Sequence, residues 1–423
     1  MKGFWVLHVA LGVALRCDLV FGIRISTLGS LFGRALGNKG MQGSQQDEKL
    51  AGRALATKQE ILAPTGLRGL RVKGHEGWFY YTDVEFGDPP QHFLAAIDIG
   101  WSDTFVPSTK CTENHEYCTR HNLYNSSYSS SYQKNGTRVS MVYHRGQSGG
   151  YASTDTLRIG DLTIANQSFE ETIIMETNAL DDIYDSVLPL PRLRISDLWS
   201  TLGATSPFHN MIDQNLLKHN IFSLMLSDSS VDREGELLFG AINEDLYSEY
   251  LNTFPAIEGT ANFPILNQAL AAGWNLAARS ISFGFSNEEP LFTWNLSGYT
   301  VALSTSWPMI LLPNRIVRVI AGYFGDPPSG EIDCDRRDNL PDLTILLGDD
   351  PGIPFILKPN DYIREEPDFR VFPGGGNCQI ELFGMPEEDE ETPILLLGSV
   401  FLARFYSVFD YDNATISLAN LKV

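Results

Sequence analysis

The stretch AAIDIGWSDTFVP, residues 95–107, decides the fold because a later stretch, TVALSTSWPMILLP at residues 300–313, repeats its plan. When Asp98 is aligned with Ser304, a tryptophan and a closing proline also fall into register. The proline lies nine residues after the aligned position in both copies. One copy therefore carries a carboxylate where the other carries a hydroxyl.

The repetition extends beyond these two motifs. About ninety residues after each motif comes an apolar stretch, at 186–190 in the first half and at 394–399 in the second. Such a long period indicates a duplicated lobe, not a solenoid. The two equivalent loops are then expected to meet at a pseudo-twofold axis between the lobes, and clefts between domains are where ligands bind.

The secondary-structure pattern is mostly β. Segments rich in β-branched and aromatic residues alternate with Gly, Pro, Asn and Asp turns. Helical periodicity is scarce, and the best helix candidates are residues 208–220 and 313–325. The predicted strands fall within residues 78–86, 92–99, 138–144, 156–164, 171–175, 236–242, 299–303, 309–313, 342–348, 394–402, 406–412 and 415–421.

Composition sets the broad class. The chain has 423 residues, enough for two domains, and its 43% apolar and 20% charged content is that of a globular protein. Its formal net charge is −21. A chain this acidic is not expected to bind nucleic acid or an anionic membrane through bulk electrostatics.

The N-terminus has the pattern of a secretory signal. Lys2 precedes an apolar run from residue 4 to residue 15, which is too short to span a bilayer and suits a signal-peptide core. We predict a signal peptide over residues 1–22; a buried N-terminal helix is the alternative. We expect no membrane anchor, because no other run reaches transmembrane length and the C-terminal tail is too polar for a lipid-anchor signal.

Residues 23–73 differ in charge from the rest of the chain. They hold nine basic and three acidic residues, a net of +6, whereas the chain after them has 20 basic and 48 acidic residues. This contrast predicts a basic pro-segment held against an acidic body. A flexible basic linker is the alternative. The body then divides into an N-terminal β lobe, 74–245, and a C-terminal β lobe, 246–423.

Cysteines and sequons both suit the secretory pathway. Cys17 falls inside the predicted signal, and four cysteines remain, which allow three pairings of two disulfides. Metal ligation is the rival reading, but the spacings lack a paired CxxC pattern. The four cysteines are Cys111, Cys118, Cys334 and Cys378, and the glycosylation sequons are at Asn125, Asn135, Asn166, Asn295 and Asn413.

The motifs resemble those of one family. IDIGWSDTFVPS resembles the first active-site loop of pepsin-like aspartic peptidases, and the stretch at 139–160 resembles their flap, with Tyr143 as the flap tyrosine and Gly146 in its turn. Residues 394–419 are similar to the C-terminal signature. The likeness covers roughly residues 78–423 and suggests a divergent, secreted member resembling fungal forms.

This resemblance implies an all-β, bilobal fold with a deep peptide-binding cleft between two pseudo-twofold-related lobes. In the family two carboxylates share a proton and activate a water, one as base and one as acid. It also implies roles in substrate binding for Gly100, Tyr143, Gly146 and Thr305. The resemblance further implies that the cysteines pair locally, 111 with 118 and 334 with 378. No cofactor or metal is implied, and we expect a monomer.

The departures concern catalysis. Asp98 is present, but Ser304 stands at the second catalytic position, and a serine can neither ionise nor protonate an oxyanion as a carboxylic acid does. Ile99 has lost the hydroxyl that the family uses to bond across to the other loop, whereas Thr305 keeps it. The only other Asp-x-Gly after the first motif, at 350–352, is predicted to be a surface turn.

Three functions follow from these departures. The first is an inactive or impaired secreted homologue, a pseudoprotease that binds peptides or proteins in its cleft. The second is an active acid endopeptidase with an altered site, in which Asp98 alone serves as base. The third is a structural or storage glycoprotein that does not use its cleft. For Asp98 itself the plainer alternative is a carboxylate retained only to bond the backbone of its loop.

Overall fold

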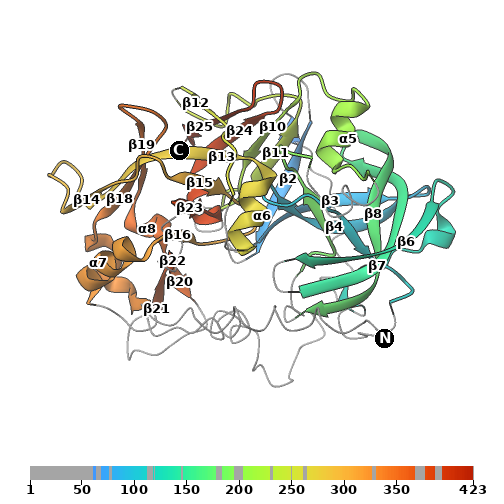
Figure 1. The fold of residues 1–423 in the computed structure, drawn as a ribbon, viewed down its shortest axis with the longest axis horizontal. Helices are drawn as coiled ribbons and strands as arrows, with labels where there is room; N and C mark the ends of the chain where they lie inside the picture. The colour runs from blue at the N-terminus through green and yellow to red at the C-terminus, as the bar shows by residue number, and fades with distance from the viewer. Residues whose placement is uncertain are drawn as a thin grey trace, which may run out of the picture.

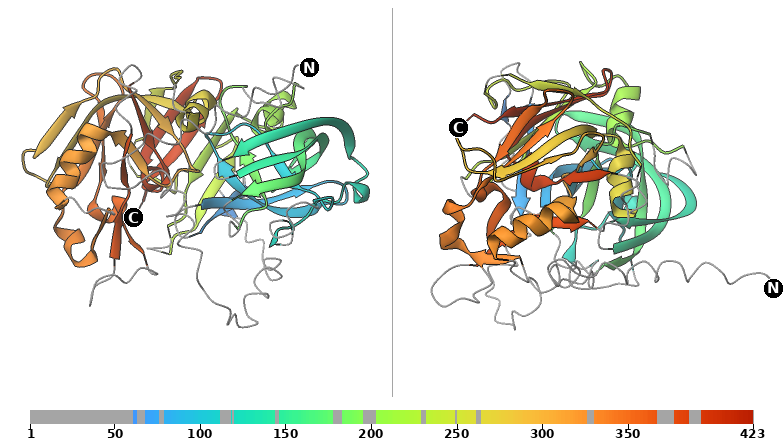
Figure 2. Two further views of the ribbon diagram at one scale, coloured as in Figure 1. Left: turned by 60° about the horizontal axis from the view of Figure 1, so that its bottom comes forward. Right: turned by 60° about the vertical axis from the view of Figure 1, so that its left-hand side comes forward.

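A computed structural model gives the fold of the chain (Figures 1 and 2). The predicted signal peptide and most of the predicted pro-segment lie outside the residues it describes. The structure describes residues 61–62, 68–75, 79–111, 118, 120–143, 146–177, 183–194, 203–228, 232–248, 250–260, 264–325, 330–366, 377–385 and 393–422.

The predicted all-β architecture is confirmed. A 14-stranded sheet curls through the N-terminal half and also takes in the last strands of the chain. It consists of β1 (Ile61–Leu62), β2 (Arg68–His75), β3 (Phe79–Phe86), β4 (Gln91–Asp98), β5 (Phe105–Pro107), β6 (Gln133–Tyr143), β7 (Gly146–Ile159), β8 (Leu162–Thr177), β9 (Ser186–Pro189), β10 (Ile221–Met225), β11 (Gly235–Phe239), β12 (Asn252–Pro255), β24 (Phe405–Asp410) and β25 (Thr415–Asn420).

Two further sheets form the other side of the molecule, on the left in Figure 1. The larger has eight strands and the smaller has three. The eight are β13 (Asn275–Gly284), β14 (Phe292–Asn295), β15 (Thr300–Leu303), β16 (Ile310–Pro313), β18 (Asp342–Leu347), β19 (Ile353–Leu357), β22 (Leu382–Met385) and β23 (Ile394–Leu397), and the three are β17 (Glu331–Asp333), β20 (Ile363–Glu366) and β21 (Asn377–Ile380).

The strand pairing repeats the duplication seen in the sequence. β4, which ends at Asp98, runs parallel to β9, and β15, which ends one residue before Ser304, runs parallel to β23. The strand after each motif also has a parallel partner, β8 for β5 and β22 for β16. Each motif loop therefore leaves one parallel pair and enters another, which gives the two loops equivalent positions in their lobes.

Helices are short and few among the described residues. They are η1 (Ser126–Tyr128), α5 (Pro207–Asp213), α6 (Pro264–Ala272), α7 (Asn314–Phe324), η3 (Cys334–Asn339), α8 (Pro359–Tyr362) and α9 (Ser399–Leu402). The helix predicted at 313–325 is confirmed as α7. The helix predicted at 208–220 is wrong in its second half: α5 ends at Asp213, and Asn215 turns the chain with a φ of 54°.

The central sheet crosses the predicted boundaries. β2, which spans the end of the predicted pro-segment at residue 73, pairs with β3 and β11. β10 in the predicted N-terminal lobe pairs with β24 in the predicted C-terminal lobe. A protein that began at Lys73 would lose most of β2 from this sheet.

Buried apolar residues of both halves form one continuous core, and two satellite clusters lie beside the motif loops. The predicted turn at 350–352 does connect two strands, β18 and β19. Every helix in the described part of the chain is too short or too polar to pass through a lipid bilayer.

Candidate active site

Asp98 is the last residue of β4 and is buried, with 1% of its surface exposed. Its Oδ1 accepts a hydrogen bond from the backbone N–H of Gly100 at 2.8 Å, and its Oδ2 accepts one from the Tyr143 hydroxyl at 3.0 Å. Its own carbonyl accepts from the N–H of Leu190, just after β9, at 2.8 Å. Backbone pairing and side-chain contacts thus fix the orientation of this carboxylate.

Tyr143 ends β6, one strand of the predicted flap, and its side chain turns inward. β6 and β7 form an antiparallel hairpin in which Tyr143 pairs with Gly146. The Tyr143 ring packs edge-on against Trp101 and Phe105, with centroids 5.1 Å and 5.9 Å apart. These rings belong to the satellite cluster of the N-terminal half, so aromatic packing holds the tyrosine hydroxyl at Asp98.

The second motif loop carries Ser304 immediately after β15, and this residue is fully buried. The Ser304 hydroxyl lies 3.0 Å from that of Ser306 and accepts the Ser306 backbone N–H at 3.3 Å. The loop therefore repeats the turn geometry of the first, in which Oδ1 of Asp98 accepts the N–H two residues on. A hydroxyl takes the structural place of the carboxylate oxygen.

Thr305 joins the two loops. Its hydroxyl donates to the carbonyl of Ile97 at 2.6 Å and accepts the backbone N–H of Ile99 at 3.2 Å, both on the first loop. The Ile99 side chain has no hydroxyl to return the contact and is itself fully buried. These two hydrogen bonds to backbone groups of the first loop satisfy the buried Thr305 hydroxyl and hold the two loops together.

The two apolar stretches that follow the motifs differ at the position that faces the motif residue. Gly398 lies where a side-chain carbon would come within 2.1 Å of the Trp307 carbonyl and 2.3 Å of the Met309 carbonyl, so only glycine fits. Pro189 is at the corresponding place in the first half, opposite Asp98 in the parallel pair. The crowding that requires glycine is therefore specific to the second loop.

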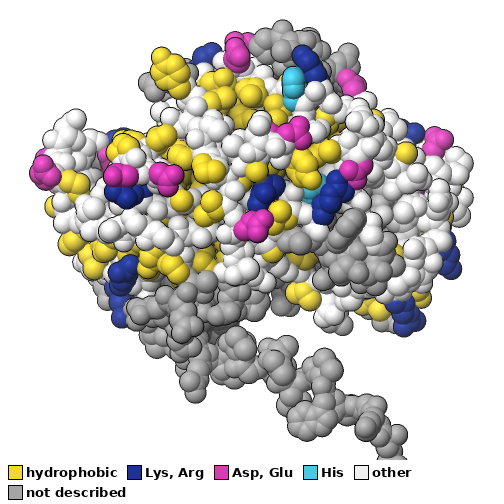
Figure 3. Space-filling view, turned by 45° about the horizontal axis from the view of Figure 1, so that its top comes forward, with side chains coloured by type: hydrophobic (Ala, Val, Ile, Leu, Met, Phe, Trp, Pro, Cys, Tyr) yellow, Lys and Arg dark blue, Asp and Glu magenta, His cyan; other side chains and the backbone are white. Residues whose placement is uncertain are grey.

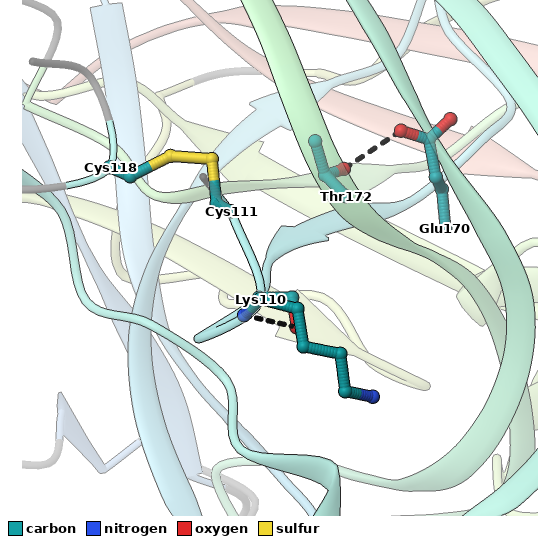
Figure 4. The surroundings of a disulfide bond; sticks show 6 residues. Lys110, Cys111, Cys118, Glu170 and Thr172 are labelled. Atoms are coloured by element: carbon teal, nitrogen blue, oxygen red, sulfur yellow. Dashed lines mark hydrogen bonds between the residues drawn. A yellow bond between two sulfur atoms is a disulfide. The ribbon is translucent and has the colours of Figure 1, made fainter. Parts of the chain in front are cut away.

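A second buried carboxylate, Glu170 on β8, lies in the same half of the molecule. It is fully buried, and the Thr172 hydroxyl donates to its Oε1 at 2.8 Å (Figure 4). Burial raises the pKa of Glu170 from 4.5 to about 7, an effect that the Thr172 hydrogen bond partly offsets and the nearby charge of Asp103 increases. This group was not identified from the sequence, where it reads as an ordinary strand glutamate.

Both locally paired disulfides are present, Cys111–Cys118 and Cys334–Cys378, and the first appears in Figure 4. Among the described residues no group of three or more His, Cys, Asp or Glu side chains is placed to hold a metal ion. The sequon asparagines are accessible: Asn125 is half-buried and the others are exposed. In three of them the hydroxyl two residues on donates to the asparagine oxygen, at Asn125, Asn135 and Asn295.

Two equivalent strand–loop units, one of them carrying an aspartate that accepts a hydrogen bond from a hairpin tyrosine, define a bilobal protein of the pepsin-like class. The chain belongs to the eukaryotic aspartyl protease family, whose model matches residues 79–421. It is 32% identical over 348 residues to vacuolar protease A of Neurospora crassa, covering 81% of this chain and 78% of that protein.

Other relatives extend the comparison to animals. The chain is 30% identical over 348 residues to cathepsin D of Gallus gallus, with 80% of each protein covered. It is 29% identical over 352 residues to gastricsin of Mus musculus, again with 80% of each covered. The similarity thus spans both halves of the fold.

Proposed function

We propose that this protein is a family member with impaired or absent proteolysis, which binds peptides or proteins in the cleft between its lobes. One observation carries the proposal. Both oxygens of Asp98 accept hydrogen bonds from the protein's own groups, while the Ser304 hydroxyl is hydrogen-bonded to the hydroxyl and the backbone N–H of Ser306 in its own loop. The two-carboxylate arrangement of the family has become one carboxylate and one alcohol.

This exchange removes the acid of the reaction. In the two-carboxylate mechanism one group deprotonates the water and the other, protonated, donates to the scissile carbonyl. The Ser304 hydroxyl cannot lower the cost of the developing oxyanion by giving up a proton as a carboxylic acid does. Loss of a positioned general acid typically lowers rates by about 10²–10⁴-fold.

The alternative is an acid endopeptidase with an altered site. Asp98 is buried and held in a defined orientation, as a base must be, and the relatives named above are called proteases. In this alternative Asp98 activates the water alone, and the Ser304 hydroxyl donates a hydrogen bond to the carbonyl oxygen without transferring a proton.

Four residues are proposed to shape the binding site. Tyr143 and Gly146 face each other at the end of the flap hairpin, where an extended ligand would be covered. Gly100 leaves room beside the Asp98 carboxylate, and Thr305 fixes the distance between the loops through its two hydrogen bonds to the first loop. A cleft between the lobes requires a fixed distance between the two loops, so we propose that Thr305 positions one loop against the other and does not contact the reacting atoms.

We also propose passage through the secretory pathway, to the vacuole or the cell exterior. The predicted signal peptide, the accessible sequons and the two disulfides suit that route, and several relatives are named vacuolar protease A. The basic segment at 23–73 is proposed to act as a pro-segment against the acidic body. On this proposal the protein is a monomer.

The first test is proteolysis by the full chain, purified from a eukaryotic secretory host, between pH 3 and 6. Wild type is compared with Asp98→Ala and Ser304→Asp. We expect no cleavage by wild type beyond that of Asp98→Ala. Cleavage by wild type that disappears in Asp98→Ala would establish the endopeptidase alternative.

The second test separates a ligand-binding protein from a structural glycoprotein. Calorimetry with a statine-type peptide inhibitor and a diverse peptide library measures whether the cleft is used. We expect heat of binding with at least one peptide, weakened by Tyr143→Ala. No heat from any peptide, in a sample whose disulfides and fold are intact, would count against a working cleft in the protein as isolated.

A further inference from the structure

Helix α6 lies against the first motif loop. A side-chain carbon placed on Gly100 would meet Asp98 Oδ1 at 3.3 Å and both the Cα and the Cβ of Ala269 at 3.5 Å. Ala269 belongs to α6 and is buried, with 3% of its surface exposed. A methyl group on Gly100 would therefore touch both the Asp98 carboxylate and this helix.

The same helix touches the flap. The Gln268 side-chain amide donates to the backbone carbonyl of Val142 at 3.4 Å, one residue before Tyr143. In Figure 1, α6 is seen between the strands of the C-terminal half and the ends of β6 and β7. This side-chain donor occupies a strand carbonyl of the kind to which the backbone N–H of an extended peptide donates when it docks beside a strand.

Helix α6 also packs against the second motif loop and the strands beside it. Leu266, Ala269 and Leu270 of α6 form a satellite cluster with residues of β15, β16 and β23, and Trp307 packs against this cluster. The face of α6 toward these strands is apolar, whereas Asn267 and Gln268 are exposed. The helix is thus bounded by the first loop, the flap and the second loop together.

The C-terminal end of α6 is tied to the N-terminal half. The carbonyl of Ala272 accepts the backbone N–H groups of Arg192 and Leu193 at 2.8 Å and 3.0 Å. The Arg192 side chain donates to the carbonyl of Gly273 at 2.7 Å. These bonds satisfy carbonyls that a helix end leaves without intrahelical partners, so the docked position is specifically held.

We propose that α6 is a built-in occupant of the peptide site, and that a ligand reaches Asp98 only when α6 moves away. Neighbouring strands lie about 4.8 Å apart, so a peptide paired with the flap needs its backbone where α6 now contacts Val142 and Gly100. The inference rests on the proposed function, since it regulates the same cleft.

Figure 3 shows one face of the molecule in a space-filling view. Acidic and basic side chains are interspersed on this face among apolar and uncharged ones. The chain buries the apolar face of α6 in place of a ligand. Binding must then exchange one set of apolar contacts for another. The apparent affinity equals the intrinsic affinity multiplied by the fraction of molecules in which α6 is undocked.

The test places a thiol on the helix. In Ala269→Cys the thiol is buried while α6 is docked, and in the control Asn267→Cys it is exposed on the same helix. Labelling rates with a maleimide reagent are measured with and without a saturating statine-type peptide. We expect the peptide to speed labelling at position 269 at least tenfold and to leave position 267 within twofold.

If wild type binds no peptide, a variant in which α6 is undocked tests whether the helix blocks the site. Leu266→Ser exposes a polar group in the apolar face of α6, and Ala269→Cys in this background reports whether the helix has moved. We expect undocking to raise peptide affinity at least tenfold over wild type. Thermal unfolding checks that the rest of the protein remains folded.

The outcomes separate the two proposals. Peptide binding to wild type with unchanged labelling at position 269 overturns the role of α6 and leaves the proposed function standing. Equal peptide affinities of wild type and the undocked variant would also overturn the role of α6. An undocked, folded form that binds no peptide overturns the proposed function itself, and the gate with it.

Discussion

Replacing Glu170 with glutamine should make this protein more stable at neutral and alkaline pH. Glu170 is fully buried on β8, where its carboxyl has few groups to replace water. Its pKa is raised from 4.5 to about 7, first by burial and then by the nearby charge of Asp103, against the Thr172 hydrogen bond. The folded protein therefore resists ionising this group, and glutamine mimics its protonated form.

The direction and size of the expected change in the free energy of unfolding follow from the difference between the folded and unfolded pKa of Glu170. Because the folded pKa lies above the unfolded one, the stability that Glu170 contributes is complete below about pH 4.5 and is lost as pH rises through about 7. At about 1.36 kcal/mol for each unit of pKa difference, the loss at pH 8 is about 3 kcal/mol. Glu170→Gln should recover up to that amount at pH 8 and change little at pH 4.

Urea unfolding at pH 4, 5.5 and 8 measures the difference. The adjacent Glu171→Gln is the matched control, because the Glu171 pKa is lowered: burial opposes this, but hydrogen bonds from Lys110, Tyr132 and Ser108 outweigh it. Its contribution is present above about pH 4.5, so Glu171→Gln should destabilise at pH 8. An equal effect of Glu170→Gln at pH 4 and pH 8 would refute the reasoning.

Three further outcomes are expected. Thr305→Val should lower the free energy of unfolding by about 2 kcal/mol, because it leaves two buried backbone groups of the first loop unpaired. Thr305→Ser, which keeps the hydroxyl, should cost less, and urea titration compares the two. Replacing Cys334 and Cys378 with serine should cost about 4 kcal/mol, against about 2.5 kcal/mol for Cys111 and Cys118, since the loop closed by the first pair is longer (separations of 44 and 7). Equal midpoints for the two double variants would contradict the loop-length argument.

Local pattern was enough to predict the β fold and the equivalence of the motif loops. Alternating apolar residues bounded by turn residues predict strands directly. The equal spacing after Asp98 and Ser304 predicted equivalent loops, and each loop does follow a strand in a parallel pair. The helix at 314–324 has a clear apolar face and was predicted, whereas α5 was predicted too long because Asn215 adopts a left-handed turn that sequence pattern does not reveal.

The close contacts at the site depend on packing between distant segments. That Thr305 must find partners follows from its burial, but which backbone groups it bonds depends on the approach of two loops about two hundred residues apart. The direct hydrogen bond from Tyr143 to Asp98 likewise depends on how aromatic rings pack around the flap. Helix α6 was not among the predicted helices, because PILNQALAA is a short apolar run, and nothing in its composition says what it covers.

The segment that completes the sheet at Asp98 is also the one that anchors α6. β9 pairs with β4 up to Asp98, and the chain then passes through Leu190 to Arg192, whose N–H and guanidinium hold the end of α6. The Trp274 indole donates to the Leu190 carbonyl at 2.8 Å, which joins the two attachments. We therefore expect movement of α6 to begin at its N-terminal turn, where Leu266 packs, and not at its anchored C-terminal end. This is why Leu266→Ser should open the site without disturbing the strand that positions the carboxylate.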